Sequence, residues 1–253
     1  MSGKRWALVA AALLIAAGCM PKDPRDIQRA SVHYNLGNNY LNQGDPTSAL
    51  RELLEAEKLN DKDPHIQYSL GLALNAKGRY KDSLEHYRKA LSLDPKYTEV
   101  HNAMGATYLE LGEWDAAIQE FNAVLKDLLY QTPFYVENNL GWAYYKKGDL
   151  QSAIGHYRNA LRVKPDFGLA HYNLALALRD SKQIDQAILE FNQAATLVPG
   201  FADTHFQLGK LYLETGKKKE AQQSFEEVVR LAPQSDNARM SREYLELLKK
   251  AGK

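Results

Sequence analysis

The sequence predicts an all-α fold in which pairs of helices stack one after another along the chain. A seven-residue stretch, Tyr34 to Tyr40, returns five more times with the same pattern of aromatic, apolar and small residues. The small residue at its centre recurs in steps of 34, 34, 36, 34 and 34 residues. A fixed period of this length is typical of a solenoid of helix pairs. These central residues are Gly37, Gly71, Gly105, Gly141, Ala175 and Gly209.

Two further columns of residues support this prediction. A second small residue follows the first by about twelve positions, at Ala49, Ser83, Ala117, Ala153, Ala187 and Ala221. Four positions later comes a large side chain, at Leu53, Tyr87, Phe121, Tyr157, Phe191 and Phe225. Small residues allow two antiparallel helices to approach closely, and the large one fills the remaining space. Because one helix pair cannot bury its apolar stripe alone, we expect the pairs to stack into a common core.

The helix ends are marked by glycine and proline. Glycines recur where a short turn between the two helices of a pair requires a positive φ, at Gly44, Gly78, Gly112, Gly148 and Gly216. Prolines follow the second helix of several units, at Pro95, Pro165, Pro199 and Pro233. A last helix is expected at residues 236–253, capped by Ser235 or Asp236, with Met240, Tyr244, Leu247 and Leu248 on one face.

The combined pattern, L-G-x-x-Y, then A-x-x-x-F, then P, resembles the tetratricopeptide repeat from residue 30 to residue 235. The resemblance implies a right-handed superhelical solenoid of six repeats followed by a C-terminal capping helix. The expected repeats are residues 30–63, 64–97, 98–133, 134–167, 168–201 and 202–235. This fold usually binds other molecules and rarely catalyses reactions.

The N-terminal residues are expected to lie outside the fold. Lys4 and Arg5 precede an apolar run from Trp6 to Ala17, which is shorter than the roughly 20 residues that span a bilayer. We interpret residues 1–18 as a signal peptide. The following Cys19 is the single cysteine of the chain, and its context resembles a bacterial lipoprotein signal. An ordinary signal peptide with an incidental cysteine is the alternative.

Acylation of Cys19 would hold the protein at a membrane. The resemblance to lipoproteins implies about three acyl chains, an effectively permanent anchor because each buried methylene contributes roughly 0.8 kcal/mol. Met20, in place of aspartate, favours the outer membrane under the enterobacterial sorting rule. Residues 19–29 are then the acylated cysteine and a polar, proline-containing linker, and we expect a protein that faces the periplasm.

The junction between the third and fourth units is irregular because its step is 36 residues instead of 34. Leu128, Leu129 and Tyr130 stand where other units turn, and the expected proline is displaced to Pro133. One interpretation is a longer second helix that packs these residues locally. The other is a bulge that contacts a partner. Spacing alone favours the longer helix.

Composition and motifs argue against several functions. The chain has 32 basic and 31 acidic side chains and no basic stripe, so nucleic-acid binding is not predicted. Six of the seven histidines recur at two fixed positions of the repeat, which indicates a scaffold role instead of metal binding. We find no paired nucleophile and base and no phosphate-binding glycine loop. The sequence therefore predicts no enzyme, no metal, no cofactor and no small-molecule substrate.

Binding of a protein partner is the function that the sequence favours. In this fold the first helix of each unit lines the concave side, where positions at helical spacing form a groove. Aromatic and amide side chains there suit an extended peptide, although the same rings could pack between neighbouring units. The groove residues that we predict are Tyr34, Asn38, Tyr68, Asn102, Tyr135, Asn138, Trp142, Tyr145, Tyr172, Arg179 and Phe206. The densest group of these begins at Tyr135.

A closer resemblance rests on the junction. The segment from Asn122 to Leu125, then Tyr130 to Pro133, then Asn139 to Tyr144, is similar to the "N-A-L … Y-x-T-P … N-L-G" segment of the type IV pilus pilotin lipoproteins, the PilF, PilW and Tgl group. This resemblance implies an outer-membrane lipoprotein that helps the pilus secretin to assemble, with a secretin subunit as the favoured partner. The alternative is a periplasmic lipoprotein adaptor that scaffolds cell-wall hydrolases or synthases.

Overall fold

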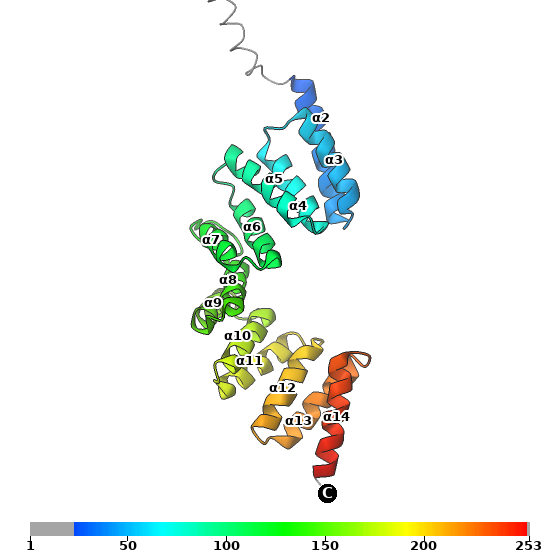
Figure 1. Ribbon diagram of the computed structural model, residues 1–253, viewed down its shortest axis with the longest axis vertical. Helices are drawn as coiled ribbons and strands as arrows, with labels where there is room; N and C mark the ends of the chain where they lie inside the picture. Colours follow the sequence, from blue (N-terminus) through cyan, green and yellow to red (C-terminus); the bar gives the residue numbers. More distant parts are fainter. Residues whose placement is uncertain (1–22, 252–253) are drawn as a thin grey trace, which may run out of the picture. The chain divides into compact units, whose positions relative to one another are not determined.

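The computed structural model describes residues 23–251, and every regular element among them is an α-helix (Figure 1). These residues belong to two compact units, of which the N-terminal unit ends at Ala103 and the C-terminal unit begins at Met104, within one helix. The helices are α2 (Pro24–Asn42), α3 (Pro46–Leu59), α4 (Pro64–Ala76), α5 (Tyr80–Leu93), α6 (Thr98–Leu111), α7 (Trp114–Val124), α8 (Pro133–Lys147), α9 (Leu150–Val163), α10 (Gly168–Asp180), α11 (Ile184–Leu197), α12 (Ala202–Glu214), α13 (Lys218–Leu231) and α14 (Asp236–Ala251).

Consecutive helices pack as hairpins, and each hairpin packs on the next within its unit. In the N-terminal unit α2 pairs with α3, α4 pairs with α5, and α3 packs on α4. In the C-terminal unit α8 pairs with α9, α10 with α11 and α12 with α13, and each second helix packs on the helix that follows it. The predicted all-α fold of paired helices is therefore confirmed, and it agrees with six repeats and a capping helix.

The predicted contact between a small and a large residue holds each hairpin together. A β-carbon added to Gly141 would lie 2.6 Å from the Tyr157 ring, and one added to Gly209 would lie 2.6 Å from the Phe225 ring. The large residue of every repeat, from Leu53 to Phe225, is fully buried. Such distances leave no room for a methyl group, so the glycine allows the two backbones to approach until the ring fills the space between them.

The turn inside each hairpin has a left-handed residue, as the glycine column predicts. Gly44, Gly78, Gly112, Gly148 and Gly216 have φ between 72° and 84°. In the fifth repeat the equivalent residue is Lys182, with φ 65°. A lysine therefore adopts a conformation that costs a residue with a β-carbon roughly 1–2 kcal/mol.

The first helix begins earlier than the sequence predicts. The sequence predicts a linker over residues 19–29, but residues 24–29 form the first turns of α2. Asp23 caps this helix by accepting a hydrogen bond from the backbone N–H of Arg25 (2.8 Å), and Pro24 occupies the first helical position. The predicted signal peptide, Cys19 and the first residues of the predicted linker lie outside the described residues.

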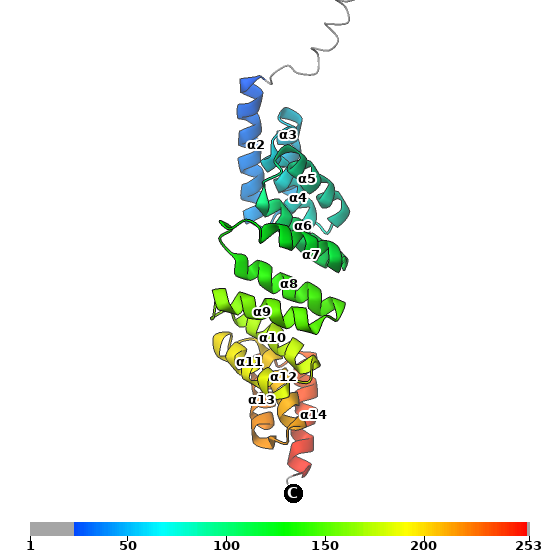
Figure 2. The ribbon, with the colours of Figure 1, turned by 90° about the vertical axis from the view of Figure 1, so that its left-hand side faces the viewer.

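The junction between α7 and α8 differs from the favoured interpretation. The helix α7 has 11 residues, whereas α5 and α9 have 14, so the second helix is shorter instead of longer (Figure 2). The helix α7 ends at Val124, and Asp127 then forms a turn in which its carboxylate accepts the backbone N–H of Leu129 (3.0 Å) and its carbonyl accepts that of Tyr130 (3.2 Å). Leu128 and Leu129 are consequently 94% and 88% exposed and do not pack locally.

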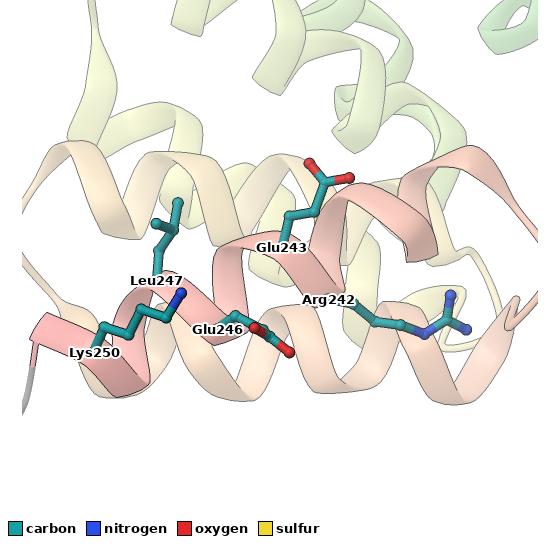
Figure 3. A pocket seen from close by; sticks show the side chains of 5 residues that line it. All are labelled: Arg242, Glu243, Glu246, Leu247 and Lys250. Carbon is teal, nitrogen blue, oxygen red and sulfur yellow. The ribbon is translucent and has the colours of Figure 1, made fainter.

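The last helix, α14, covers the C-terminal hairpin. The Ser235 hydroxyl accepts the backbone N–H of Ala238 (3.1 Å) and caps the helix. Met240, Tyr244, Leu245 and Leu248 pack against Phe225 and its neighbours. Leu247, predicted on the same face, is 60% exposed and lies in a shallow hollow lined by charged side chains of α14 (Figure 3). The buried side of α14 runs through Ala238, Ser241, Leu245 and Leu248, and Leu247 lies beyond the edge of that side.

Candidate protein-binding surface

The first helices of the C-terminal unit are joined by a chain of polar side chains. The Tyr145 hydroxyl on α8 donates to the Asp180 carboxylate on α10 (2.6 Å). The other Asp180 oxygen accepts Nε of Arg179 (2.8 Å), and a terminal nitrogen of Arg179 donates to the Gln207 amide oxygen on α12 (2.7 Å). Three successive first helices are thus connected side chain to side chain.

Asp203 is the second centre of this arrangement. Its carboxylate accepts the Tyr172 hydroxyl of α10, the Gln207 amide (3.3 Å) and the Asn237 amide of α14 (2.8 Å). We call the whole set the inner network, and it consists of Tyr145, Tyr172, Arg179, Asp180, Asp203, Gln207 and Asn237. All seven residues lie on the first helices α8, α10 and α12 or on α14. First helices are the ones that the repeat pattern predicts on the concave side.

The electrostatics keep the tyrosines of the inner network as neutral donors. Partial burial, followed by the bond to Asp180, raises the pKa of Tyr145 to about 12. Burial and Asp203 raise the pKa of Tyr172 in the same way. Burial and the nearby Arg179 lower the pKa of Lys210 below its usual value. The surface therefore offers hydroxyl, amide, carboxylate and cationic groups side by side.

An aromatic group adjoins the inner network on α8. The rings of Trp142 and Tyr145 stack with centroids 5.5 Å apart and planes inclined by 23°. Nζ of Lys146 lies 5.4 Å from the centre of the Trp142 ring and 5.8 Å from that of Trp114. Large, partly exposed rings next to hydrogen-bonding groups are what a peptide-binding surface requires, because rings supply area and amides or hydroxyls bind backbone groups.

Other predicted groove residues of this unit have different surroundings. Asn138 is buried and its amide oxygen accepts Asn173 of the next repeat (3.0 Å). Phe206 is also buried, against Phe225. Tyr135 is 51% exposed and belongs to an aromatic cluster with Phe134 and Phe167. Asn138 and Phe206 thus hold the scaffold together, whereas Tyr135 is accessible.

The remaining predicted residues lie in the N-terminal unit. Tyr34 packs against the core of the first hairpins. Asn38 accepts a hydrogen bond from Ser69 (2.9 Å), and the Tyr68 ring contacts that of Tyr97 with centroids 5.1 Å apart. Asn102 lies on α6 and is half-buried. The structure therefore brings together Trp142, Tyr145, Tyr172 and Arg179 in the C-terminal unit. Tyr34, Asn38, Tyr68 and Asn102 belong to the other compact unit.

Four of the seven histidines join the two helices within a repeat. His33 contacts Glu52 (2.8 Å), His171 contacts Glu190 (2.6 Å) and His156 contacts Glu137 (2.7 Å). His86 similarly contacts Gln67 (2.9 Å). The two partners are always 19 residues apart, and histidine stands on either the first or the second helix. This reciprocal pattern was readable in the sequence, and it gives these four rings a structural role. Among residues 23–251, no group of three histidine, aspartate or glutamate side chains is arranged to hold a metal ion.

Comparison with known proteins supports the repeat assignment. A tetratricopeptide repeat model matches residues 34–98 and 138–200, about half of the chain, and a second one matches 74–128 and 178–243. Human tetratricopeptide repeat protein 6 is 26% identical over 166 residues, which cover 64% of this chain and 31% of that protein. The chain therefore spans about a third of this curated relative. None of the described helices has the length and apolarity needed to cross a bilayer.

Two solved structures resemble this fold over most of their length. PilF of Pseudomonas aeruginosa has a TM-score of 0.75 and 20% identity, covering 86% of this chain and 98% of that chain. PilW, described as a widely conserved type IV pilus biogenesis factor, has a TM-score of 0.77 and 21% identity, covering 83% of this chain and 97% of that chain. At this identity the likeness concerns the fold.

Proposed function

Because the chain belongs to the tetratricopeptide repeat family, we propose that it is a lipid-anchored, protein-binding scaffold that assists assembly of the type IV pilus secretin in the outer membrane. The protein faces the periplasm in this proposal and performs no chemical reaction. Its partner is a secretin subunit, bound through the repeats.

One observation carries the proposal, namely the extent of the likeness to PilF and PilW. Both chains are covered almost completely, so their folds match this one in extent. The N-terminal sequence adds support, since an apolar run is followed directly by Cys19 and then by Met20. An acylated Cys19 would lie only four residues before Asp23, where α2 is capped, and would hold the repeats near the bilayer.

We assign the binding surface to the inner network and the adjoining Trp142. Its aromatic and hydrogen-bonding groups are partly exposed, and they extend over four helices of the C-terminal unit, α8, α10, α12 and α14. A segment of partner chain lying across these helices could contact each repeat in turn.

Deletion of the gene tests the function. We expect secretin monomers to accumulate and heat-stable secretin multimers to disappear from outer-membrane fractions, as judged by gel electrophoresis and immunoblotting of the secretin. Complementation with the full-length gene is the control. Normal multimers in the deletion strain would exclude the assembly role.

The surface is tested separately with a double substitution, Trp142→Ala with Tyr145→Ala. We expect it to reduce cross-linking to the secretin in isolated membranes while the helical content stays unchanged. The matched control is Val163→Ala with Leu189→Ala, two residues of second helices that are 53% and 59% exposed. Equal loss of cross-linking in both variants would show that the inner network is not the site.

The anchor is tested with Cys19→Ala. The variant is expected to move from the membrane pellet to the soluble fraction. If it still sediments with the outer membrane, the anchor lies elsewhere. The adaptor hypothesis makes a different prediction for the cross-linking experiment, in which cell-wall hydrolases or synthases, and not the secretin, would be identified by mass.

A further inference from the structure

The helix α2 presents two apolar residues in places that every later repeat buries. Val32 and Leu36 are 63% and 38% exposed. One period later, Ile66 and Leu70 occupy the same places on α4 and are at most 1% exposed. The equivalent residues of the next four repeats are all 4% exposed or less, namely Val100, Val136, Ala170 and Thr204 in the first place and Met104, Leu140, Leu174 and Leu208 in the second.

The structure itself shows what covers these places. Ile66 and Leu70 share one apolar cluster with Leu53, Ala56 and Leu59 of α3, the helix before α4. In the C-terminal unit, α7, α9 and α11 pack in the same way on the helices that follow them. The covering element is an α-helix each time. Among residues 23–251, no helix precedes α2.

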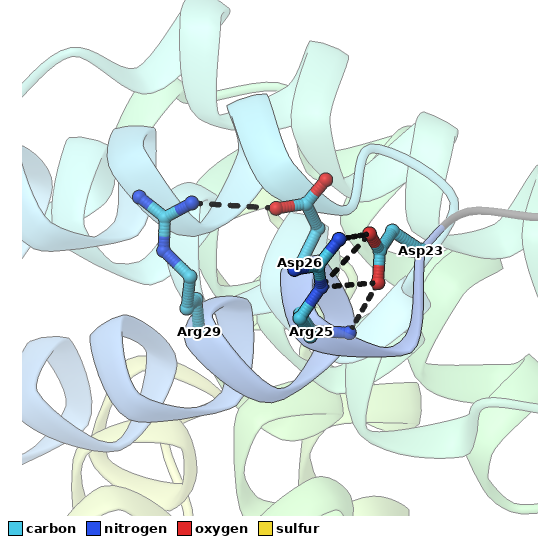
Figure 4. Close-up of polar contacts among 4 residues, drawn as sticks. All are labelled: Asp23, Arg25, Asp26 and Arg29. Carbon is cyan, nitrogen blue, oxygen red and sulfur yellow. Dashed lines mark hydrogen bonds and ion pairs between the residues drawn. The ribbon is translucent and has the colours of Figure 1, made fainter.

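The exposed stripe continues with basic residues. Arg25, Arg29, Val32 and Leu36 follow one another at spacings of four, three and four, which places them along one side of α2. We call these four residues the N-terminal face. The side chains of Arg25 and Arg29 are 87% and 67% exposed, and each pairs with a neighbouring carboxylate, Asp23 or Asp26 (Figure 4). Exposed pairs of this kind contribute little energy, so both arginines can exchange partners.

We propose that the N-terminal face binds one amphipathic α-helix of another protein. The helix would carry apolar residues at the spacing of Leu53, Ala56 and Leu59, and carboxylates at its edge that meet Arg25 and Arg29. It would occupy the place that, for a later repeat, is filled by the second helix of the repeat before it. This site is separate from the inner network and does not depend on it.

A second copy of the chain fits this face less well. The charged residues of the stripe are both arginines, so two copies placed face to face would bring like charges into one interface. A helix with acidic edges, such as α3 with Glu52 and Glu55, offers the complementary charges.

A peptide copied from α3 provides the probe. Residues 46–59 are synthesised with a fluorophore and a hydrocarbon staple between positions 54 and 58, which lie on the outer side of α3. We expect saturable binding to the full chain by fluorescence anisotropy, weakened about tenfold or more by Val32→Asp with Leu36→Asp. A peptide with Leu53→Asp and Ala56→Asp is the matched probe that should not bind. Leu189→Asp in the chain, at another exposed apolar residue, should leave binding unchanged.

Several results would overturn the proposal. One is equal binding to the wild-type chain and the Val32→Asp, Leu36→Asp variant, and another is no saturable binding to either. A dimer in sedimentation analysis that the same variant dissociates would assign the face to a second copy. Binding only to a chain that begins at Cys19 would show that residues 1–18 cover it. Val32→Ser with Leu36→Ser, with a thermal melt by circular dichroism, separates loss of docking from loss of folding.

Discussion

Lys182 and Gly148 occupy the same place in successive repeats, and both have a left-handed backbone, with φ of 65° and 84°. Lys182→Gly is therefore expected to raise the free energy of unfolding by about 0.5–1 kcal/mol. The strain relieved is roughly 1–2 kcal/mol, and the greater freedom of glycine in the unfolded chain offsets part of it. Urea denaturation followed by circular dichroism measures the change. Gly148→Ala is the reverse control and is expected to destabilise, and a loss of stability in Lys182→Gly would contradict this account.

Tyr157 is fully buried, and its hydroxyl finds no hydrogen-bond partner among the described residues. Burial also raises the pKa of this hydroxyl. Because an unsatisfied buried hydroxyl costs about 1–3 kcal/mol, Tyr157→Phe is expected to stabilise the protein by about 1 kcal/mol. Phenylalanine already occupies this place in three other repeats. Tyr157→Leu is the control that also removes the ring and is expected to destabilise. If Tyr157→Phe lowers the denaturation midpoint, the hydroxyl has a partner after all.

Replacing glycine by alanine is expected to have opposite effects on stability at Gly141 and at Gly155. A β-carbon on Gly141 meets the Tyr157 ring at 2.6 Å, so Gly141→Ala is expected to cost about 1–3 kcal/mol through overpacking. A β-carbon on Gly155, in the exposed part of α9, meets nothing within 4 Å, so Gly155→Ala is expected to gain about 0.5–1 kcal/mol. Thermal and urea unfolding of the two variants side by side check the pair. Similar changes in both would mean that the ring moves aside.

Stability is expected to fall as the pH decreases from 7.5 to 5.5. Burial lowers the pKa of His86 and of His205 in the folded protein. Below the ordinary histidine pKa of about 6.5, the unfolded chain therefore binds more protons than the folded one, and the equilibrium moves toward unfolding. His86→Gln with His205→Gln is expected to flatten the dependence of unfolding free energy on pH in this range. Each single variant should remove part of the slope. An unchanged slope in the double variant would assign it to other groups.

The repeat pattern made the hairpins, the packing of glycines against rings and the left-handed turns predictable, because each depends on residue size at a fixed spacing. The junction was not predictable in the same way. Leu128 and Leu129 look like core residues by type, and only the Asp127 turn turns them toward solvent. Leu247 was likewise predicted on the wrong face, because its apolar type does not reveal that the buried side of α14 runs through Ser241, Leu245 and Leu248.

Part of the candidate surface was also beyond sequence reasoning. Tyr145, Tyr172 and Arg179 were predicted from their positions, but their partners Asp180 and Asp203 were not. The bond between Tyr145 and Asp180 joins residues 35 positions apart, and it depends on side-chain rotamers that spacing does not specify. The pairing of histidine with glutamate at a separation of 19 is different, because a search for reciprocal substitutions would have found it.

The first hairpin combines two conditions that none of the later ones shares. Its buried large residue is Leu53 instead of an aromatic ring, and among the described residues it has a neighbour on one side alone. Opening of the array is therefore easiest from this end, and amide protons of α2 and α3 would exchange soonest with deuterium. A protein that binds this end through a helix would slow the exchange of these amide protons. It would also protect the amides of the following hairpins, because opening of the array would no longer begin at this end.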